Sequence, residues 1–357
     1  MHYFQFAEKH STLYQASSSL NAGLDEVLEV RKDVSPTGLV VNSSRILVKF
    51  DLSYISKSVS DNVITNPKYY LNLFDAKPTA LATSQSLFAY PVSQSWTMGE
   101  GRSYDNPTTT EGCSWIFRDG KLDGKNWNAS VSASGGTFFT ASAASHSFTK
   151  DSIDMRMDVT DIVNGWLTGN KPNEGFMVKR SGSAETDNSH LGNFSFFSTD
   201  THTKYPPTLE VQWDDSNWST GSLSALSSNE MEDMVVYMKG LRPEYHGKSK
   251  VKFRLVGRSR YPEKTYSTTP SNLTVKTLPS GSTFYSILDA ETLDVVVPFG
   301  SGSKVSCDST GNYFNLWLDG YQPERYYSLR FRVQSGSNTV EESDQYYDEG
   351  FTFKVTK

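Results

Sequence analysis

The chain has 357 residues, with 40 acidic and 34 basic side chains and a formal net charge of −6. A chain of this length can bury a large core, and we expect two domains. The mildly acidic balance gives no global attraction for nucleic acid or acidic lipid, which argues against a nucleic-acid or membrane partner. Aromatic residues make up 13% of the sequence and are spaced by Ser, Thr and Asn, which favours an all-β protein.

The ends and the cysteines of the sequence bear on where the protein acts. No stretch approaches the roughly 20 apolar residues of a membrane-spanning helix. The first residues lack the basic cluster and apolar segment of a secretory signal, so we expect synthesis in the cytoplasm and exit, if any, by assembly into a particle. Cys113 and Cys307 are the only cysteines, which excludes a disulfide framework and predicts two buried thiols.

Short alternating or aromatic runs predict strands through the first part of the chain. Each run is bounded by Gly, Pro, Asn or Ser, as in a sandwich with long loops. The predicted strands cover residues 45–52, 69–76, 87–92, 147–157, 175–179, 193–197 and 208–213. We therefore expect a jelly-roll-like β-sandwich over residues 1–218.

One short helix is predicted in this part, within residues 158–169. Thr160 can cap its first turn, Asp161 complements the positive end of the helix dipole, and Gly169 can end it in a left-handed conformation. Because a lone helix of two turns is stable only when packed, its apolar face should lie on the sandwich. That face consists of Ile162, Val163 and Trp166.

A second set of strands follows a Ser-rich stretch, residues 219–230, which predicts a linker. The predicted strands cover residues 233–239, 250–258, 284–288, 293–299, 313–318, 326–333 and 351–355. Their number and rhythm fit an immunoglobulin-like sandwich over residues 231–357, although the cysteine pair and central Trp of a true immunoglobulin domain are absent.

The strongest candidate for a binding site combines aromatic and acidic residues. Trp96, Trp115 and Trp127, together with Tyr104, lie near several carboxylates, and aromatic rings beside carboxylates are typical of a sugar site. The alternative is a long ordered loop whose tryptophans cover the sandwich. Exposure of these rings on one surface would favour glycan binding, and their burial would favour a structural role.

Groups that could carry out chemistry are scattered. The six histidines form no zinc-binding spacing, and no nucleophile elbow, P-loop or dinucleotide turn occurs, so we expect neither an enzyme nor a cofactor. A structural calcium ion is an alternative, because oxygen-rich loops of extracellular sandwiches often hold one. The candidate ligands are Asp105, Asn106, Asp187, Asn188 and Asp200.

Two further stretches each allow two interpretations. Asp200, Thr201 and His202 could form a site, but the following Pro206-Pro207 pair favours a loop that leads into a last strand. The basic stretch 248–260 would place its alternating charges on one face of a strand. That face is either solvated or an interface with an acidic partner subunit.

Several motifs resemble the DNRLRE-type β-sandwich domain, a family found on large surface proteins and in bacteriophage virions. The resemblance covers about residues 1–215 and is carried by segments 44–53, 157–166, 174–179 and 206–211. It implies a jelly-roll-like fold similar to carbohydrate-binding modules. It also implies a virion structural protein of a tailed phage, placed at the neck, tail or capsid surface and contacting other virion proteins in multiple copies. The alternative is a carbohydrate-binding adhesin for host attachment.

Overall fold

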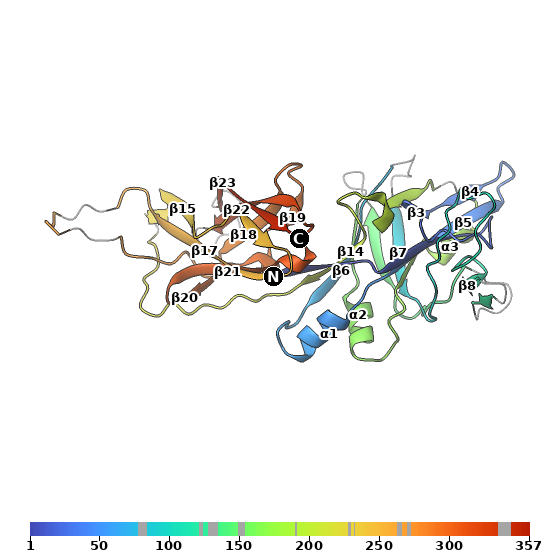
Figure 1. Cartoon of the computed structure of the whole chain (residues 1–357), viewed down its shortest axis with the longest axis horizontal. Helices are drawn as coiled ribbons and strands as arrows, with labels where there is room; N and C mark the ends of the chain where they lie inside the picture. The colour runs from blue at the N-terminus through green and yellow to red at the C-terminus, as the bar shows by residue number, and fades with distance from the viewer. Residues whose placement is uncertain are drawn as a thin grey trace. The chain divides into compact units, whose positions relative to one another are not determined.

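The computed structural model describes residues 1–77, 84–120, 124–127, 135–148, 154–189, 191–227, 230–231, 233–262, 266–269, 273–334 and 344–357 (Figure 1). Antiparallel sheets dominate both parts of the chain, which confirms the predicted all-β sandwich class. The chain forms two compact units. The N-terminal unit comprises Gln5–Val63 and Lys68–Val211, and the C-terminal unit comprises Met1–Phe4, Ile64–Pro67 and Gln212–Lys357.

The N-terminal unit is built on a six-stranded sheet of order β10-β7-β12-β5-β2, with β4 also paired to β5, and on a four-stranded sheet of order β1-β14-β6-β11. Two further pairs are β13-β3 and β8-β9. The strands are β1 (His2–Phe6), β2 (Lys9–Tyr14), β3 (Val27–Val30), β4 (Lys32–Val34), β5 (Val40–Lys49), β6 (Lys68–Leu73), β7 (Gln85–Pro91), β8 (Phe117–Asp119), β9 (Lys125–Asn126), β10 (Ala144–Phe148), β11 (Met155–Asp158), β12 (Phe176–Lys179), β13 (Phe194–Phe197) and β14 (Thr208–Gln212).

Every predicted strand of this half corresponds to one or two of these strands. The predicted strand 147–157 is divided between β10 and β11, and residues 149–153 lie outside the described residues. Among the described residues, β1 to β4, β8, β9 and the helices α1 (Ser53–Ser60) and α3 (Gly182–Thr186) were not predicted. A 3₁₀ helix covers Thr199–Thr201.

Helix α2 (Thr160–Leu167) forms where the sequence predicts it, but its N-terminus is built differently. The prediction that Thr160 caps the helix is wrong: the carboxylate of Asp158 accepts a hydrogen bond from the backbone N–H of Thr160 at 3.0 Å. The hydroxyl of Thr160 instead accepts from the N–H of Tyr69 in β6, also at 3.0 Å. Gly169 has a φ of +75°, which confirms the left-handed end. The predicted apolar face, Ile162, Val163 and Trp166, is buried.

The C-terminal unit has the strand order of an immunoglobulin domain. One sheet has the order β15-β17-β21-β20 and the other β16-β23-β22-β18-β19, so the strands follow the A-B-E-D and G-F-C arrangement of that fold. The strands are β15 (Met234–Lys239), β16 (Glu244–His246), β17 (Lys250–Ser259), β18 (Thr283–Asp289), β19 (Val295–Val297), β20 (Ser306–Asp308), β21 (Gly311–Trp317), β22 (Arg325–Gln334) and β23 (Asp344–Thr356). Two 3₁₀ helices cover Ser301–Ser303 and Leu318–Gly320.

The unit has the tyrosine corner of an immunoglobulin domain, and a packed aromatic core in place of that domain's disulfide and Trp. The hydroxyl of Tyr327, near the start of β22, donates to the carbonyl of Gln322 at 3.2 Å and accepts from its N–H at 3.0 Å. Tyr285 is 1% exposed, and its ring lies 4.4 Å from that of Phe314. Both cysteines are free and buried, as predicted. Aromatic stacking therefore fills this core without a covalent link.

The stretch predicted as a linker, as far as it is described, lies along the C-terminal unit. Trp218 and Ala225 form parallel bridges with Cys307 and Thr277. Leu226 is buried in the core of the unit. Residues 212–218, expected in the first domain, also cluster with the C-terminal unit.

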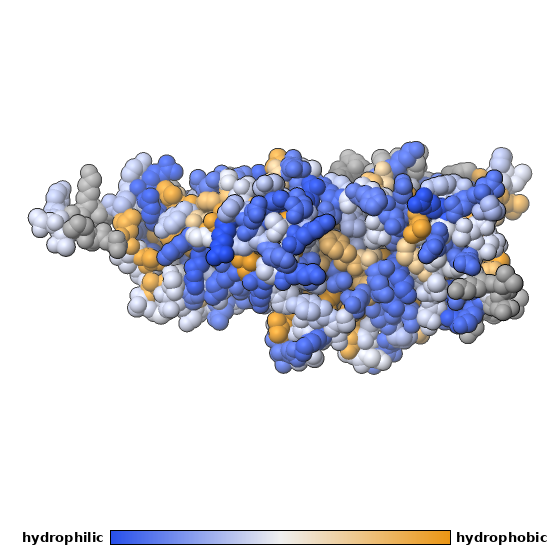
Figure 2. Space-filling model, in the orientation of Figure 1, coloured by the Kyte–Doolittle hydropathy of each residue, from blue (hydrophilic) through white to orange (hydrophobic). Residues whose placement is uncertain are grey.

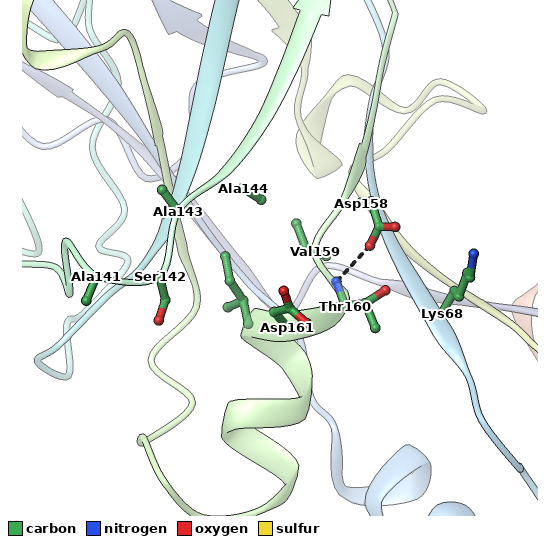
Figure 3. Close-up of a pocket in the computed structure, with 10 residues that line it drawn as sticks. Lys68, Ala141, Ser142, Ala143, Ala144, Asp158, Val159, Thr160 and Asp161 are labelled. Carbon is green, nitrogen blue, oxygen red and sulfur yellow. Dashed lines mark hydrogen bonds between the residues drawn. The ribbon is translucent and has the colours of Figure 1, made fainter.

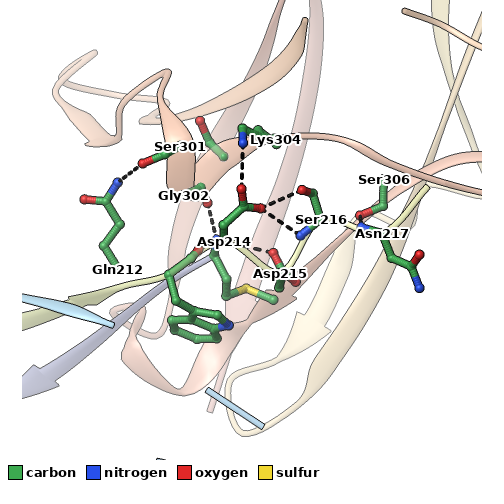
Figure 4. Close-up of polar contacts among 12 residues, drawn as sticks. Gln212, Asp214, Asp215, Ser216, Asn217, Ser301, Gly302, Lys304 and Ser306 are labelled. Carbon is green, nitrogen blue, oxygen red and sulfur yellow. Dashed lines mark hydrogen bonds and ion pairs between the residues drawn. The ribbon is translucent and has the colours of Figure 1, made fainter. Parts of the chain in front are cut away.

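The start of the chain is held by the same unit. The amino group of Met1 donates to the carbonyl of Trp213 at 2.5 Å and to that of Gly302, and it lies 3.3 Å from the Asp215 carboxylate. Burial lowers the pKa of this amino group. Around it, Figure 4 shows Asp214 paired with Lys304 at 2.6 Å. These contacts fix the first residues of β1 against the segment that follows β14.

Candidate functional site

The three predicted tryptophans gather in one buried cluster of the N-terminal unit. Trp96, Trp115 and Trp127 are only 4%, 6% and 4% exposed. They pack with apolar side chains of the sheet and the loop, namely Leu13, Leu47, Val92, Cys113 and Met177. The structure therefore brings the three indoles together in a core, without a ring face exposed to solvent.

The polar edges of these indoles are bonded inside the protein. The Nε1 of Trp96 donates to the carbonyl of Glu174 at 2.9 Å, and the Nε1 of Trp127 donates to the carbonyl of Ser114 at 3.0 Å. Such internal partners are what a buried indole requires. A sugar ring would therefore have to displace protein to reach either ring.

The loop that carries Trp96 and Trp115 is held by Asn21, which is fully buried. Its Nδ2 donates to the carbonyls of Met98 and Cys113 at 2.7 and 2.8 Å. Its Oδ1 accepts from the N–H groups of Gly101 and Gly23 at 2.8 and 3.3 Å. One side chain thus satisfies backbone groups from three segments, which makes residues 96–120 an ordered loop.

Of the four aromatic residues predicted for a sugar site, Tyr104 is the exposed one, at 69%. Its hydroxyl accepts a hydrogen bond from Arg102 Nη1 at 3.0 Å, and the guanidinium also lies 5.9 Å from the ring centroid. The structure does not bring Tyr104 into the indole cluster. A single exposed tyrosine beside an arginine offers one ring face to a ligand.

Next to the indole cluster lies a set of buried charges that the sequence did not predict. Arg45 donates from Nε and Nη2 to Glu185 at 3.0 and 2.9 Å, and its guanidinium lies 4.8 Å from the ring centroid of Trp115. The Nζ of Lys179 also lies 2.7 Å from Glu185. Burial lowers the pKa of Lys179, and Glu185 opposes this effect. Two cations thus share one carboxylate, which fastens α3 to β5 and β12.

A fully buried arginine continues this set. Arg180 donates to the carbonyl of Gly192 at 2.5 Å and to the side chain of Gln85, and burial lowers its pKa to about 10. The Cζ of the Arg180 guanidinium lies 5.2 Å from the ring centroid of Phe194. No local pattern distinguishes such an arginine from an exposed one, because its partners come from other parts of the chain.

The region around residue 200 forms a turn and not a converging site. The hydroxyl of Ser198 accepts from the N–H of Asp200 at 3.1 Å, and His202 is exposed with a φ of +52°. Asp200 instead meets His10, a buried residue of β2, whose Nε2 lies 3.1 Å from its carboxylate and 2.6 Å from Thr199 Oγ1. Burial lowers the pKa of His10.

The proposed calcium ligands lie in separate loops and have protein partners. Asp105 accepts from the N–H of Arg102 at 2.8 Å. Asp187 pairs with Lys32, whose hydrogen bond is the largest of the effects that lower the pKa of Asp187 to about 2. Asn106 and Asn188 are exposed. Among the described residues, no three His, Cys, Asp or Glu side chains gather as a metal site requires.

A hollow of about 480 Å³ lies beside the N-terminus of α2 (Figure 3). Its walls are residues 141–144, the first turn of α2 and the side chain of Lys68 from β6. Asp158 and Asp161 line the hollow, and the carboxylate of Asp158 already accepts a hydrogen bond from the N–H of Thr160. The volume is within the range of small-ligand sites, and the lining combines alanines with two carboxylates and one ammonium.

The sequence matches no protein-family model, and no curated protein matches it. No helix in the part of the chain that the structure describes is long and apolar enough to cross a membrane. The resemblance to the DNRLRE-type domain therefore remains a prediction from the motifs themselves.

Proposed function

We propose that the chain is a non-enzymatic structural protein of a bacteriophage virion, at the neck, tail or capsid surface, acting in multiple copies through protein–protein interfaces. The observation that carries the structural role is the burial of the three predicted indoles, with the N–H groups of Trp96 and Trp127 bonded to the backbone. Rings used in this way stabilise a fold and are not presented to a ligand.

The assignment to a phage particle depends on the resemblance, whose motifs occupy core and turn positions. Segment 44–53 contains most of β5, in which Ile46, Leu47 and Val48 are fully buried. Segment 174–179 contains β12, which is buried throughout. Packed sandwiches of this kind offer rigid faces, which repeated symmetric arrays require.

Purified particles provide the test. Density-gradient fractions of lysates that carry the gene should contain the chain in the particle peak at several copies per particle, measured by quantitative mass spectrometry. A cryo-electron microscopy map should then show two β units at each position. Detection of the chain only in the soluble fraction, with none in the particles, would refute the proposal.

A second candidate, a carbohydrate-binding adhesin, is favoured by the hollow beside α2. Its volume of about 480 Å³ can hold a sugar residue, and Asp161 can accept hydrogen bonds from sugar hydroxyls. The chain would then bind on a glycan array, and Asp161→Ala would abolish the signal. Asp161 is exposed, and Glu26→Ala, at another exposed carboxylate, is the control. Glycan binding that survives Asp161→Ala would place the sugar outside this hollow. If the chain binds no glycan, the adhesin function is refuted and the structural role is the remaining candidate.

A further inference from the structure

Basic side chains are concentrated in one short segment of an acidic chain. Residues 239–260 carry eight Lys or Arg and one acidic residue, Glu244, whereas the whole chain has a net charge of −6. This segment includes the end of β15 and all of β17. In the view of Figure 2, the surface over β17 and β21 is mostly hydrophilic.

Strand geometry places these charges on one face. In β17 the side chains of Phe253 and Leu255 point into the core, and Lys250, Lys252 and Arg254 alternate with them toward solvent. Alternate residues of a strand are about 6.8 Å apart, so the three cations form an evenly spaced row. The register of β15 sets Lys239 directly beside Arg254 and widens the row onto the next strand.

One carboxylate serves this row. Asp308 of β20 accepts from both Nη atoms of Arg254 at 2.8 Å and lies 3.4 Å from Lys252. Within the described ranges, Lys239 and Lys250 form no ion pair. The face therefore holds more positive charge than the fold neutralises, and that surplus can attract an anion.

The neighbouring aromatic rings of β21 are in contact with the ammonium groups of these lysines. Lys252 Nζ lies 3.9 Å from the ring centroid of Tyr313, and Lys250 Nζ lies 5.0 Å from that of Trp317. Trp317 is in addition 5% exposed. Single-stranded nucleic acid binds by stacking its bases on several open rings, and these two rings are covered. Among the described residues, the face offers one open ring, that of Tyr237 in β15, which is 41% exposed. Carboxylates need only the cations, as Asp308 shows by its two-bond contact with Arg254.

We propose that the outer face of β15 and β17 binds an acidic protein segment in an extended conformation, with carboxylates at alternate residues. Such carboxylates repeat at about 6.8 Å, the spacing of the cations along β17. Charge complementarity of this kind selects the partner and its register. The inference goes beyond the proposed function, because it rests on the charges of this face and not on membership of a virion.

The test measures binding of a fluorescein-labelled peptide of ten residues, the length of β17, in which Glu and Thr alternate. Fluorescence anisotropy with the full chain should show binding at about 50 mM salt that weakens strongly at about 300 mM, because exposed charges are screened. The variant K239E/K250E/K252E should bind at least about tenfold more weakly. The control K57E/K77E/K125E changes three exposed lysines of the N-terminal unit and the same net charge, and it should bind within about twofold of the unmodified chain.

Four results would overturn the proposal. They are absence of peptide binding at low salt, equal binding of a peptide with the same residues in two blocks, an equal loss in the control variant, and tighter binding of a single-stranded DNA of the same charge. Circular dichroism and the melting temperature of both variants confirm that the chain is folded. The peptide assay requires no particles, so its failure leaves the virion assignment to its own test.

Discussion

The substitution Asn21→Ala tests whether one buried amide holds the loop over the sandwich. The change leaves four backbone groups without their partner, three of them from bonds of 2.7 to 2.8 Å to Met98, Cys113 and Gly101. Each lost bond that leaves a buried group unpaired costs about 1 kcal/mol or more. We therefore expect a loss of about 3 to 4 kcal/mol, a large part of the roughly 5 to 15 kcal/mol that stabilises a typical domain.

The assay has to assign this loss to one unit, because a chain with two units can unfold in two steps. Hydrogen exchange followed by mass spectrometry reports on each unit separately. Peptides from residues 96–120 should lose protection from exchange, and peptides from the C-terminal unit should keep theirs. Asn42→Ala is the matched control, since its side chain bonds Asp33 at 3.1 Å and Ala16 N–H at 3.1 Å near the surface. A loss below about 1 kcal/mol, equal to that of the control, would refute the reasoning.

Three further changes test other parts of the fold by urea unfolding. Tyr327→Phe should cost about 1 to 2 kcal/mol in the C-terminal unit only, because both bonds to Gln322 are lost. Gly112→Ala should cost at least about 2 kcal/mol, since φ is +102° and a Cβ would lie 2.6 Å from Asn21 Nδ2. Burial lowers the pKa of His10, so the unfolded chain binds more protons and stability should fall as pH drops below about 6.5. His10→Gln should flatten that slope; an unchanged slope would contradict this.

Elements with a strong local pattern could be predicted from the sequence. The apolar run Ile46 to Val48 and the alternation in β17 are sufficient to indicate a strand wherever the chain goes. The ends of the strands were harder to predict. The predicted strand 351–355 is only the last part of β23, which begins at Asp344. The pairing of β23 with β22 also shifts register between Leu329 and Phe331. Such an irregularity depends on the partner strand, so no local pattern reveals it.

The candidate site was less predictable because exposure depends on distant residues. Trp96 stands in a Gly-rich loop, and partners distant in the sequence hold that loop on the sheet, among them Asn21, which is 77 residues from Met98. The sequence held part of this information, since Gly99 and Gly101 lack the Cβ that would collide with Asn21. Nothing in the sequence, however, pairs Asn21 with them. Tertiary contacts of this range decide whether a tryptophan is a ligand platform or a core residue.

The same reasoning separates two lysines that both lie on strands. Lys179 ends the apolar run of β12 and Lys252 alternates with apolar residues in β17, yet Lys179 is buried against Glu185 and Lys252 is 45% exposed. A ligand anion could reach Lys179 only by replacing a carboxylate already in place and desolvating itself, a cost that an extra contact rarely repays. At Lys252 an incoming carboxylate keeps part of its water and joins a row with surplus charge. The proposed binding of an acidic segment therefore depends on cations of β15 and β17 that folding leaves without a carboxylate partner in the part of the chain that the structure describes, among them Lys239 and Lys250.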